Sequence, residues 1–253
     1  MKDLKIFHKI LNLKSLKPSK ETNEAFSELV RYSENSFNKV NLNELEIFKL
    51  RKLSSEAEYE MEVHWADKII KSKNPNDELK KFWYYKNYED LVTLEHINII
   101  SINKKVKKVL FVGGGPLPLT AIVLATKYNK DCIVLEKDEL SFLKSSELIS
   151  KLKLDKQIKI INIKAENYNA YNEYDLIYLA ALVGENEKSK TKTVNYIYKR
   201  LCNKSLFLCR SSHGSRKIIY NPINKNIFKK LKPLLEVRPY SSIINSFFIL
   251  QKN

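Results

Sequence analysis

The chain has 253 residues, 43% of them hydrophobic and 11% aromatic, so it can bury one large core or two small ones. The formal net charge is +16, but only six of the 45 basic residues are arginine, and the lysines are scattered. This bias argues against a nucleic-acid-binding surface. Because no apolar run is long enough to span a membrane and the N-terminus lacks a signal-peptide core, we expect a cytoplasmic protein without membrane partners.

Residues 1–105 are predicted to form an all-helical N-terminal domain, because this stretch has no glycine and repeated apolar positions at helical spacing. One helix is expected in "SSEAEYEMEVHWADKIIK", starting at Ser54 or Ser55 and ending at Asn74-Pro75. A second, aromatic-rich helix is expected in "DELKKFWYYKNYEDLVTLEHINII".

From residue 106 the pattern changes to short apolar runs that alternate with amphipathic segments. The runs "KKVLFVG", "DCIVLE", "IKIINIKAE", "YDLIYLAAL" and "SLFLCRSS" are separated by three helical patterns, which is typical of a parallel, doubly wound sheet. The tail "EVRPYSSIINSFFILQKN" has no helix signal after Pro239 and favours antiparallel strands at the sheet edge. The sequence therefore predicts an α/β fold, with a Rossmann-like domain of the class I methyltransferase type over residues 106–253.

Three of the five glycines of the chain stand together after the first predicted strand, in "VLFVGGGPLPLT". Glycine permits positive φ and lets ligand atoms approach the backbone, so Gly113, Gly114 and Gly115 are expected to bind a nucleotide-like ligand. The second strand ends in Glu136, where an acid accepts hydrogen bonds from ribose hydroxyls. The loop carries no Walker lysine and no G-x-G-x-x-G pattern, so S-adenosylmethionine is favoured over a dinucleotide.

Several further residues at the strand ends are candidates for contacts with this ligand. Polar side chains after the third strand are expected near the adenine, and small residues after the fourth strand leave room for the ligand. The complete set of predicted nucleoside-binding residues is Gly113, Gly114, Gly115, Pro116, Leu117, Glu136, Lys137, Ala165, Glu166, Ala180 and Leu182.

Five blocks in this order resemble the nicotianamine synthase family: "SSEAEYEMEVHWAD", "NPNDELKKFWYYKNYEDL", "FVGGGPLPLTAIVLA", "LAALVGENEKSK" and "RSSHGSRKIIYNP". The resemblance covers roughly residues 50–253. The short chain and the triple glycine are similar to the microbial branch, which includes enzymes that build staphylopine-type opine metallophores.

The resemblance implies a transferase that moves the 3-amino-3-carboxypropyl (2-aminobutanoate) group of S-adenosylmethionine to an acceptor amine and releases methylthioadenosine. We expect histidine as the acceptor, with one unit transferred. The condensation of three S-adenosylmethionine molecules into nicotianamine is the sibling alternative. A methyltransferase and a basic nucleic-acid-binding protein are the alternatives of another class. No metal site is expected, because cysteines and histidines show no ligand spacing.

Two catalytic residues are carried over from the resemblance. An attacking amine must lose a proton, which a carboxylate can accept, and Glu62 matches the catalytic glutamate of the family. Tyr88, in "FWYYKNY", aligns with a tyrosine beside the reacting centre.

The substrates carry carboxylates, which arginine binds in a bidentate way. The predicted substrate-binding residues are Tyr84, Arg210, His213, Arg216 and Tyr220. We further expect the product to pass to an opine dehydrogenase, and a homodimer is possible on the resemblance alone.

Overall fold

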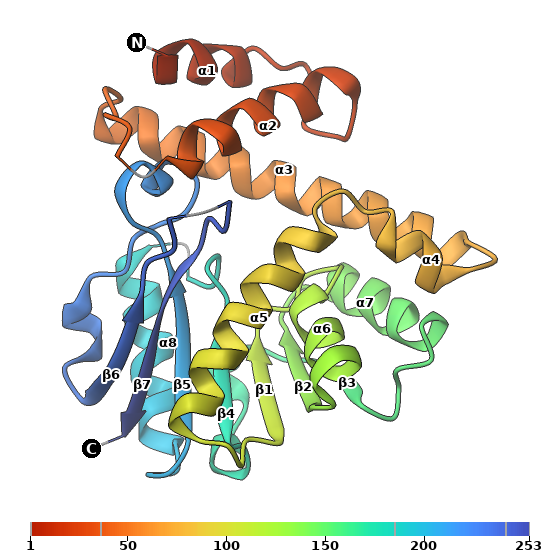
Figure 1. The fold of residues 1–253 in the computed structure, drawn as a ribbon, viewed down its shortest axis with the longest axis vertical. Helices are drawn as coiled ribbons and strands as arrows, with labels where there is room; N and C mark the ends of the chain where they lie inside the picture. The colour runs from red at the N-terminus through yellow and green to blue at the C-terminus, as the bar shows by residue number, and fades with distance from the viewer. Residues whose placement is uncertain (1, 36, 185, 241, 253) are drawn as a thin grey trace.

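The computed structural model describes residues 2–35, 37–184, 186–240 and 242–252. Its N-terminal part is helical: the first three helices lie at the upper end of the molecule, above the sheet, and α5 runs down beside the strands (Figure 1). The helices of this part are α1 (Lys2–Leu11), α2 (Lys20–Glu34), α3 (Glu44–Lys71), α4 (Pro75–Lys80) and α5 (Tyr85–Ile102).

Helix α3 begins ten residues before the predicted start at Ser54 or Ser55. The Asn43 side chain accepts a hydrogen bond from the Glu46 backbone, and the Glu46 side chain accepts one from the Asn43 N–H, so a capping box starts the helix there. Its C-terminal end lies near the predicted one, but Pro75 starts a new helix, as proline does readily at a first helical position. The second predicted helix is split at residues 81–84 into α4 and α5.

The C-terminal part is a seven-stranded sheet of order β3-β2-β1-β4-β5-β7-β6. β1 to β5 pair in parallel, whereas β7 is antiparallel to both β5 and β6. This topology confirms the predicted Rossmann-like, methyltransferase-type fold. The predicted antiparallel tail, residues 236–253, contains β7, whereas its antiparallel partner β6 lies almost wholly before that tail. The strands are β1 (Lys108–Val112), β2 (Asp131–Glu136), β3 (Ile158–Asn162), β4 (Leu176–Leu179), β5 (Leu206–Ser211), β6 (Leu231–Val237) and β7 (Ser246–Lys252).

Helices cover both faces of the sheet. α5, α6 (Leu119–Tyr128) and α7 (Glu139–Lys151) pack with the C-terminal half of α3 on one face, around a core that includes Phe111 and Tyr178. α8 (Glu187–Arg200) packs on the other face. Short 3-10 turns complete the chain: η1 (Ala165–Asn167), η2 (Tyr171–Glu173), η3 (Gly214–Ile218) and η4 (Lys225–Phe228).

A third core joins the N-terminal helices to the sheet part. Ile6, Leu29 and Leu50 of α1, α2 and α3 pack with Ile218 and Ile244, which come from the loops after β5 and before β7. The change from helices to alternating strands falls between α5 and β1, near the predicted boundary at residue 105. The division into two domains nevertheless stays a prediction, because this core draws on both parts.

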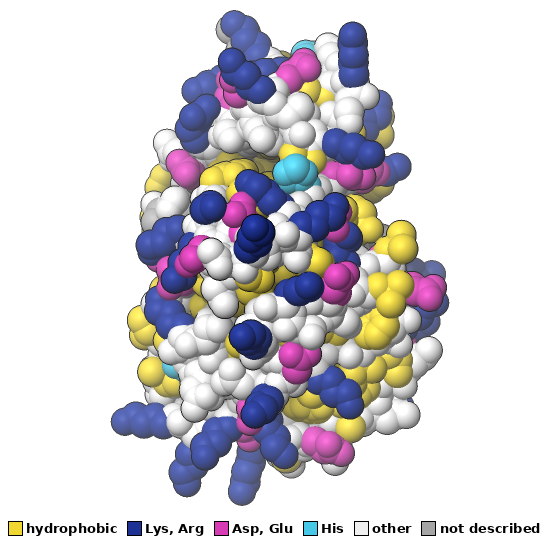
Figure 2. Space-filling model, turned by 90° about the vertical axis from the view of Figure 1, so that its right-hand side faces the viewer, with side chains coloured by type: hydrophobic (Ala, Val, Ile, Leu, Met, Phe, Trp, Pro, Cys, Tyr) yellow, Lys and Arg dark blue, Asp and Glu magenta, His cyan; other side chains and the backbone are white. Residues whose placement is uncertain are grey.

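Figure 2 shows one face of the surface, where lysine and arginine side chains are spread from end to end with acidic side chains between them. On this face the basic residues do not form one continuous stripe, and the absence of a nucleic-acid partner stays a prediction.

Candidate active site

A cavity of about 530 Å³ lies at the carboxyl ends of the parallel strands, beneath α3. Its walls come from the loops after the five parallel strands and from α3, α5 and α8. Ligands of open α/β sheets bind at this edge, and the volume is that of a site for one small molecule.

The three glycines are required by the packing of protein side chains. A Cβ on Gly113, where φ is +89°, would overlap Cγ2 of Val183, and a Cβ on Gly114 would overlap Cγ1 of Val134. A Cβ on Gly115, where φ is +64°, would lie 2.7 Å from Oε2 of Glu62. The sequence interpretation, that the bare backbone serves the approach of a ligand, is thus incomplete: the loop must also pack against the sheet and against a carboxylate from α3.

Glu136, at the end of β2, is buried and organises the glycine loop. Its Oε2 accepts the N–H of Gly115 at 2.8 Å, and its Oε1 accepts the N–H of Asp138 at 2.9 Å. Each carboxylate oxygen has a second lone pair, so the group can still accept hydrogen bonds from a ligand.

All the predicted nucleoside-binding residues line this cavity. Glu166, on η1, is held in place by the hydroxyl of Thr193 on α8, which donates to Oε1. Thr193 itself lines the cavity, as do Phe111, Asp138 and Ser189, which the sequence interpretation did not single out.

Glu62 and Glu58 lie one turn apart on α3 and both face the cavity. Burial raises the pKa of Glu62 well above its usual range, and the nearby charges of Glu58 and Glu136 raise it further. Burial also raises the pKa of Glu58, against the opposing effects of hydrogen bonds from Tyr220 and Tyr88. Sequence analysis did not single out Glu58, although its four-residue spacing from Glu62 is a signal that places both on the same helix face.

Tyr88 and Tyr220 both line the cavity and converge on Glu58. The Tyr88 hydroxyl donates to Oε1 of Glu58 at 3.2 Å, and the Tyr220 hydroxyl donates to Oε2 at 2.9 Å. The two tyrosines are 132 positions apart in the sequence, and Glu58 is 30 and 162 positions from them. No sequence signal indicated this convergence.

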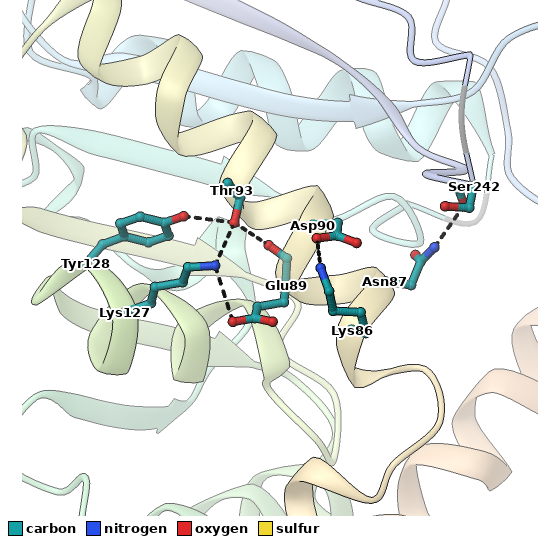
Figure 3. Close-up of polar contacts among 8 residues, drawn as sticks. All are labelled: Lys86, Asn87, Glu89, Asp90, Thr93, Lys127, Tyr128 and Ser242. Atoms are coloured by element: carbon teal, nitrogen blue, oxygen red, sulfur yellow. Dashed lines mark hydrogen bonds and ion pairs between the residues drawn. The ribbon is translucent and has the colours of Figure 1, made fainter.

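The helix that carries Tyr88 is fixed on both sides of that residue (Figure 3). The Asn87 side chain donates to the carbonyl of Ser242 at 2.8 Å, and Glu89 forms an ion pair with Lys127 of α6 at 3.2 Å. One turn further on, Thr93 accepts a hydrogen bond from Tyr128 at 2.8 Å. These contacts hold the start of α5 against α6 and the loop before β7.

Arg210, at the end of β5, also lines the cavity, but most of its hydrogen-bonding capacity is used by the protein. Its Nε and Nη2 donate to the carboxylate of Glu95 at 2.8 and 2.9 Å, and Nη2 also donates to Thr120 at 2.9 Å. Arg210 was predicted to bind a substrate carboxylate in a bidentate way. Its bidentate partner in the structure is instead the carboxylate of Glu95, which has no exposed surface.

Three of the predicted substrate-binding residues lie away from the cavity. Arg216 is fully buried and donates to the carbonyls of Ser33 and Glu34 at the end of α2, so it ties η3 to the helical part. His213 packs against Tyr240 and does not line the cavity. Tyr84 packs edge-on against Tyr88 and lines a second cavity of about 80 Å³ next to α2, which shares Glu58 and Tyr220 as wall residues with the larger one.

Asn245 is a lining residue that the sequence did not indicate. Its side chain is 8% exposed, and within the described part of the chain its Nδ2 has no hydrogen-bond partner. An unpaired buried amide costs free energy, so its position at a cavity wall points to a partner outside the protein.

Across the described residues, no group of three or more histidine, cysteine, aspartate or glutamate side chains is arranged to hold a metal ion. The same ranges contain no helix that is both long and apolar enough to cross a membrane.

The sheet order and a cavity at the carboxyl ends of its parallel strands define a Rossmann-like protein of the methyltransferase type. An S-adenosylmethionine-dependent methyltransferase from Clostridium acetobutylicum shares this fold, with a TM-score of 0.52 at 12% identity over 69% of the present chain and 94% of its own.

The family model "Nicotianamine synthase protein" matches residues 2–253, and the chain belongs to this family. Nicotianamine synthase 1 of Arabidopsis thaliana is 31% identical over 98% of the chain and 82% of the relative, and the nicotianamine synthase of Solanum lycopersicum is 30% identical over 98% and 81%. The chain is therefore a transferase that uses S-adenosylmethionine to transfer aminobutanoyl groups. These relatives are plant enzymes, so the expected microbial branch finds no support in them.

Two solved structures share the whole fold, helical part included. MtNAS in complex with MTA and tNA has a TM-score of 0.87 at 19% identity, with 100% of the present chain and 97% of that chain covered. A glutamate-to-glutamine mutant of MtNAS in complex with S-adenosylmethionine has a TM-score of 0.86 at 20% identity, with 99% and 96% covered.

Proposed function

We propose that the protein condenses aminobutanoyl groups of S-adenosylmethionine into nicotianamine, with methylthioadenosine as the by-product. The full-length similarity to plant nicotianamine synthases supports this product over the expected single transfer to histidine. The cavity volume of about 530 Å³ suits one donor at a time, so the transfers would follow one another.

In this proposal the donor lies along the carboxyl edge of the sheet. Glu136 accepts hydrogen bonds from the ribose hydroxyls through its remaining lone pairs, and the adenine lies beside Ala165 and Glu166. The sulfonium then lies near the glycine loop, and the aminobutanoyl carbons extend toward α3.

Glu62 is the proposed general base. The acceptor nitrogen attacks the methylene carbon beside the sulfonium, the C–S bond breaks, and its electron pair leaves with sulfur as neutral methylthioadenosine. The nitrogen gives up a proton, which Oε2 of Glu62 accepts. The raised pKa of Glu62 brings its basicity toward that of the amine, as general-base catalysis requires.

The observation that carries the proposal is the closeness of Glu62 to the loop after β1. A Cβ on Gly115 would lie only 2.7 Å from the Glu62 carboxylate, so the base lies at the point where the loop meets the donor cavity. A base at this point would serve any transfer from the sulfonium to an amine, and the family membership is what favours the aminobutanoyl group over the methyl group.

The test is product analysis by mass spectrometry, first with S-adenosylmethionine alone and then with an amino-acid panel that includes histidine. Nicotianamine and methylthioadenosine from S-adenosylmethionine alone are the expected products. A histidine adduct without nicotianamine would restore the histidine acceptor. S-adenosylhomocysteine as the main by-product would overturn the transferase assignment.

The remaining expectations depend on this outcome. Passage of the product to an opine dehydrogenase follows only from a single transfer to histidine, and it stays a prediction tied to that alternative. The homodimer and the cytoplasmic location also stay predictions.

A further inference from the structure

A carboxylate and two phenols from three separate segments meet in one wall of the cavity. Glu58 lies on α3, Tyr88 on α5, and Tyr220 follows η3. Both tyrosine hydroxyls donate to Glu58, one to each oxygen, at 3.2 and 2.9 Å. This arrangement uses both carboxylate oxygens and the single hydroxyl hydrogen of each phenol.

We propose that Glu58, Tyr88 and Tyr220 form a subsite for the N–H groups of the acceptor amine, in which Glu58 is a positioning residue. This subsite rests on the proposed aminobutanoyl transfer, and it requires that the acceptor present N–H groups to the phenol oxygens. Because each phenol has one O–H and donates it to Glu58, the phenol oxygens can only accept hydrogen bonds from the cavity. Two acceptors in one wall match a primary amine or ammonium and reject a carboxylate.

The charges around this wall agree with an N–H donor. Glu58, Glu62 and Glu136 all line the cavity, and the first two are acidic groups on one helix face. The guanidinium of Arg210 is the cation that acts on Glu58, but Glu95 already pairs with it. An ammonium group therefore finds a negative wall with fixed acceptors, where an anionic group would be repelled.

Glu58 and Glu62, on the same face of α3, have different roles in this subsite. Glu58 keeps the phenols turned so that their oxygens hold the amine, while Glu62, one turn further along, takes the proton. With two N–H bonds of an ammonium held by the phenol oxygens, the third N–H is the one to be lost, and the direction of the lone pair it leaves is set. Such orientation of a nucleophile is worth large factors in rate.

The test is a double-mutant cycle on methylthioadenosine release, between Glu58→Gln and the pair Tyr88→Phe with Tyr220→Phe. The amide introduced by Glu58→Gln would donate to one phenol, which turns that hydroxyl toward the cavity. We expect kcat/KM to fall about tenfold to a hundredfold, the usual effect of losing a hydrogen bond that involves a charged group. Methylthioadenosine has no aliphatic amine, so its affinity by calorimetry should stay within about twofold.

In the double phenylalanine background, the loss of kcat/KM caused by Glu58→Gln should be at least about threefold smaller than in wild type. The route through the phenols is gone there, and only the charge effect of Glu58 on Glu62 remains. The same loss in both backgrounds would overturn the subsite, as would a turnover of Glu58→Gln within twofold of wild type. The matched control is Glu56→Gln, which alters an exposed glutamate of the same helix whose partner is Lys52, and it should leave kcat/KM unchanged.

Tyr220→Phe removes one oxygen and no charge, so it keeps the test valid if Glu58→Gln does not fold. KM for S-adenosylmethionine should rise about threefold to tenfold with methylthioadenosine affinity unchanged, and an unchanged KM would contradict the subsite. The cycle follows methylthioadenosine, which every acceptor releases. A wild-type protein that makes no nicotianamine would therefore refute the proposed product without touching the subsite.

Discussion

Replacement of Glu62 by glutamine should separate catalysis from donor binding. Glutamine has the size of glutamate but cannot accept the proton of the amine, and loss of a general base costs about 100- to 10,000-fold in rate. The donor contacts come from the loops after β1 to β4, so affinity for S-adenosylmethionine should be preserved. Collapsed turnover with intact affinity is the expected result.

The same substitution should stabilise the protein, and the size of the gain should depend on pH. Charged groups face Glu62 from three elements: Glu58 on α3, Glu136 on β2 and, when ionised, Tyr88 on α5. The native pKa of Glu62 is raised, so its ionisation opposes folding. Each unit of that rise corresponds to about 1.4 kcal/mol of unfolding free energy, or about 3 to 6 °C in Tm for a chain of this size.

The sign follows from the two pKa values. Below the unfolded-state pKa of about 4.3 the carboxyl is protonated in both states, so glutamine gives no advantage. As pH rises toward the native pKa, the advantage of glutamine grows, and above the native pKa it stays constant.

The assay compares thermal melts of wild type and Glu62→Gln from pH 4 to 9, together with calorimetry and methylthioadenosine release. A Tm difference that does not change with pH would refute the inference that burial and neighbouring charges raise the pKa of Glu62. Turnover within threefold of wild type would remove Glu62 from the mechanism, and loss of donor affinity would make it a donor-site residue.

Three further substitutions test other parts of the site. Gly115→Ala should lower the unfolding free energy by about 1–2 kcal/mol, measured by chemical denaturation, because its φ is +64°. It should also lower turnover, measured by product release, because the new Cβ displaces the Glu62 carboxylate. Arg216→Ala should lower Tm by several degrees through its lost backbone contacts, yet the activity of the folded fraction should match wild type, and a lost donor affinity would contradict its distance from the cavity. Asn245→Leu should raise KM without lowering Tm, since Nδ2 has no protein partner to lose in the described residues; a fall in Tm with KM unchanged would assign it a structural role.

The five parallel strands could be predicted because each is a short apolar run with a turn or helix signal behind it. Phe111 and Val112 precede the glycines, and Leu135 precedes Glu136. The places of the glycine loop and of Glu136 at the strand ends therefore follow from local pattern. Strand β7 was predictable from the loss of helical spacing after Pro239, but β6, which ends at Val237, was not. The start of α3 could not be predicted, because Ser54 and Ser55 suit a helix cap as well as Asn43 does. In the structure, the Glu46 side chain completes a capping box with Asn43.

The partners of the buried charges could not be predicted. Arg210 lies at the end of β5 and Arg216 in the turn after it, and the two are alike in sequence terms. Arg210 nevertheless pairs with Glu95 on α5, whereas Arg216 donates to carbonyls at the end of α2. Both contacts join residues more than 100 positions apart. Local pattern indicates which side chains lie at a strand end, whereas the packing of distant helices decides whether they meet a ligand or the protein.

Helix α3 has a consequence for how ligands reach the cavity. Its 28 residues extend about 42 Å. Leu50, near its first turns, is packed in the core of the N-terminal helices, and Ile69, near its last, is packed against the sheet. A hinge that lifted the helix off the cavity would expose one of these cores to water. We therefore expect admission and release to occur by local displacement of rim residues such as Leu182, which is 44% exposed, while the carboxylates on α3 keep their positions throughout turnover.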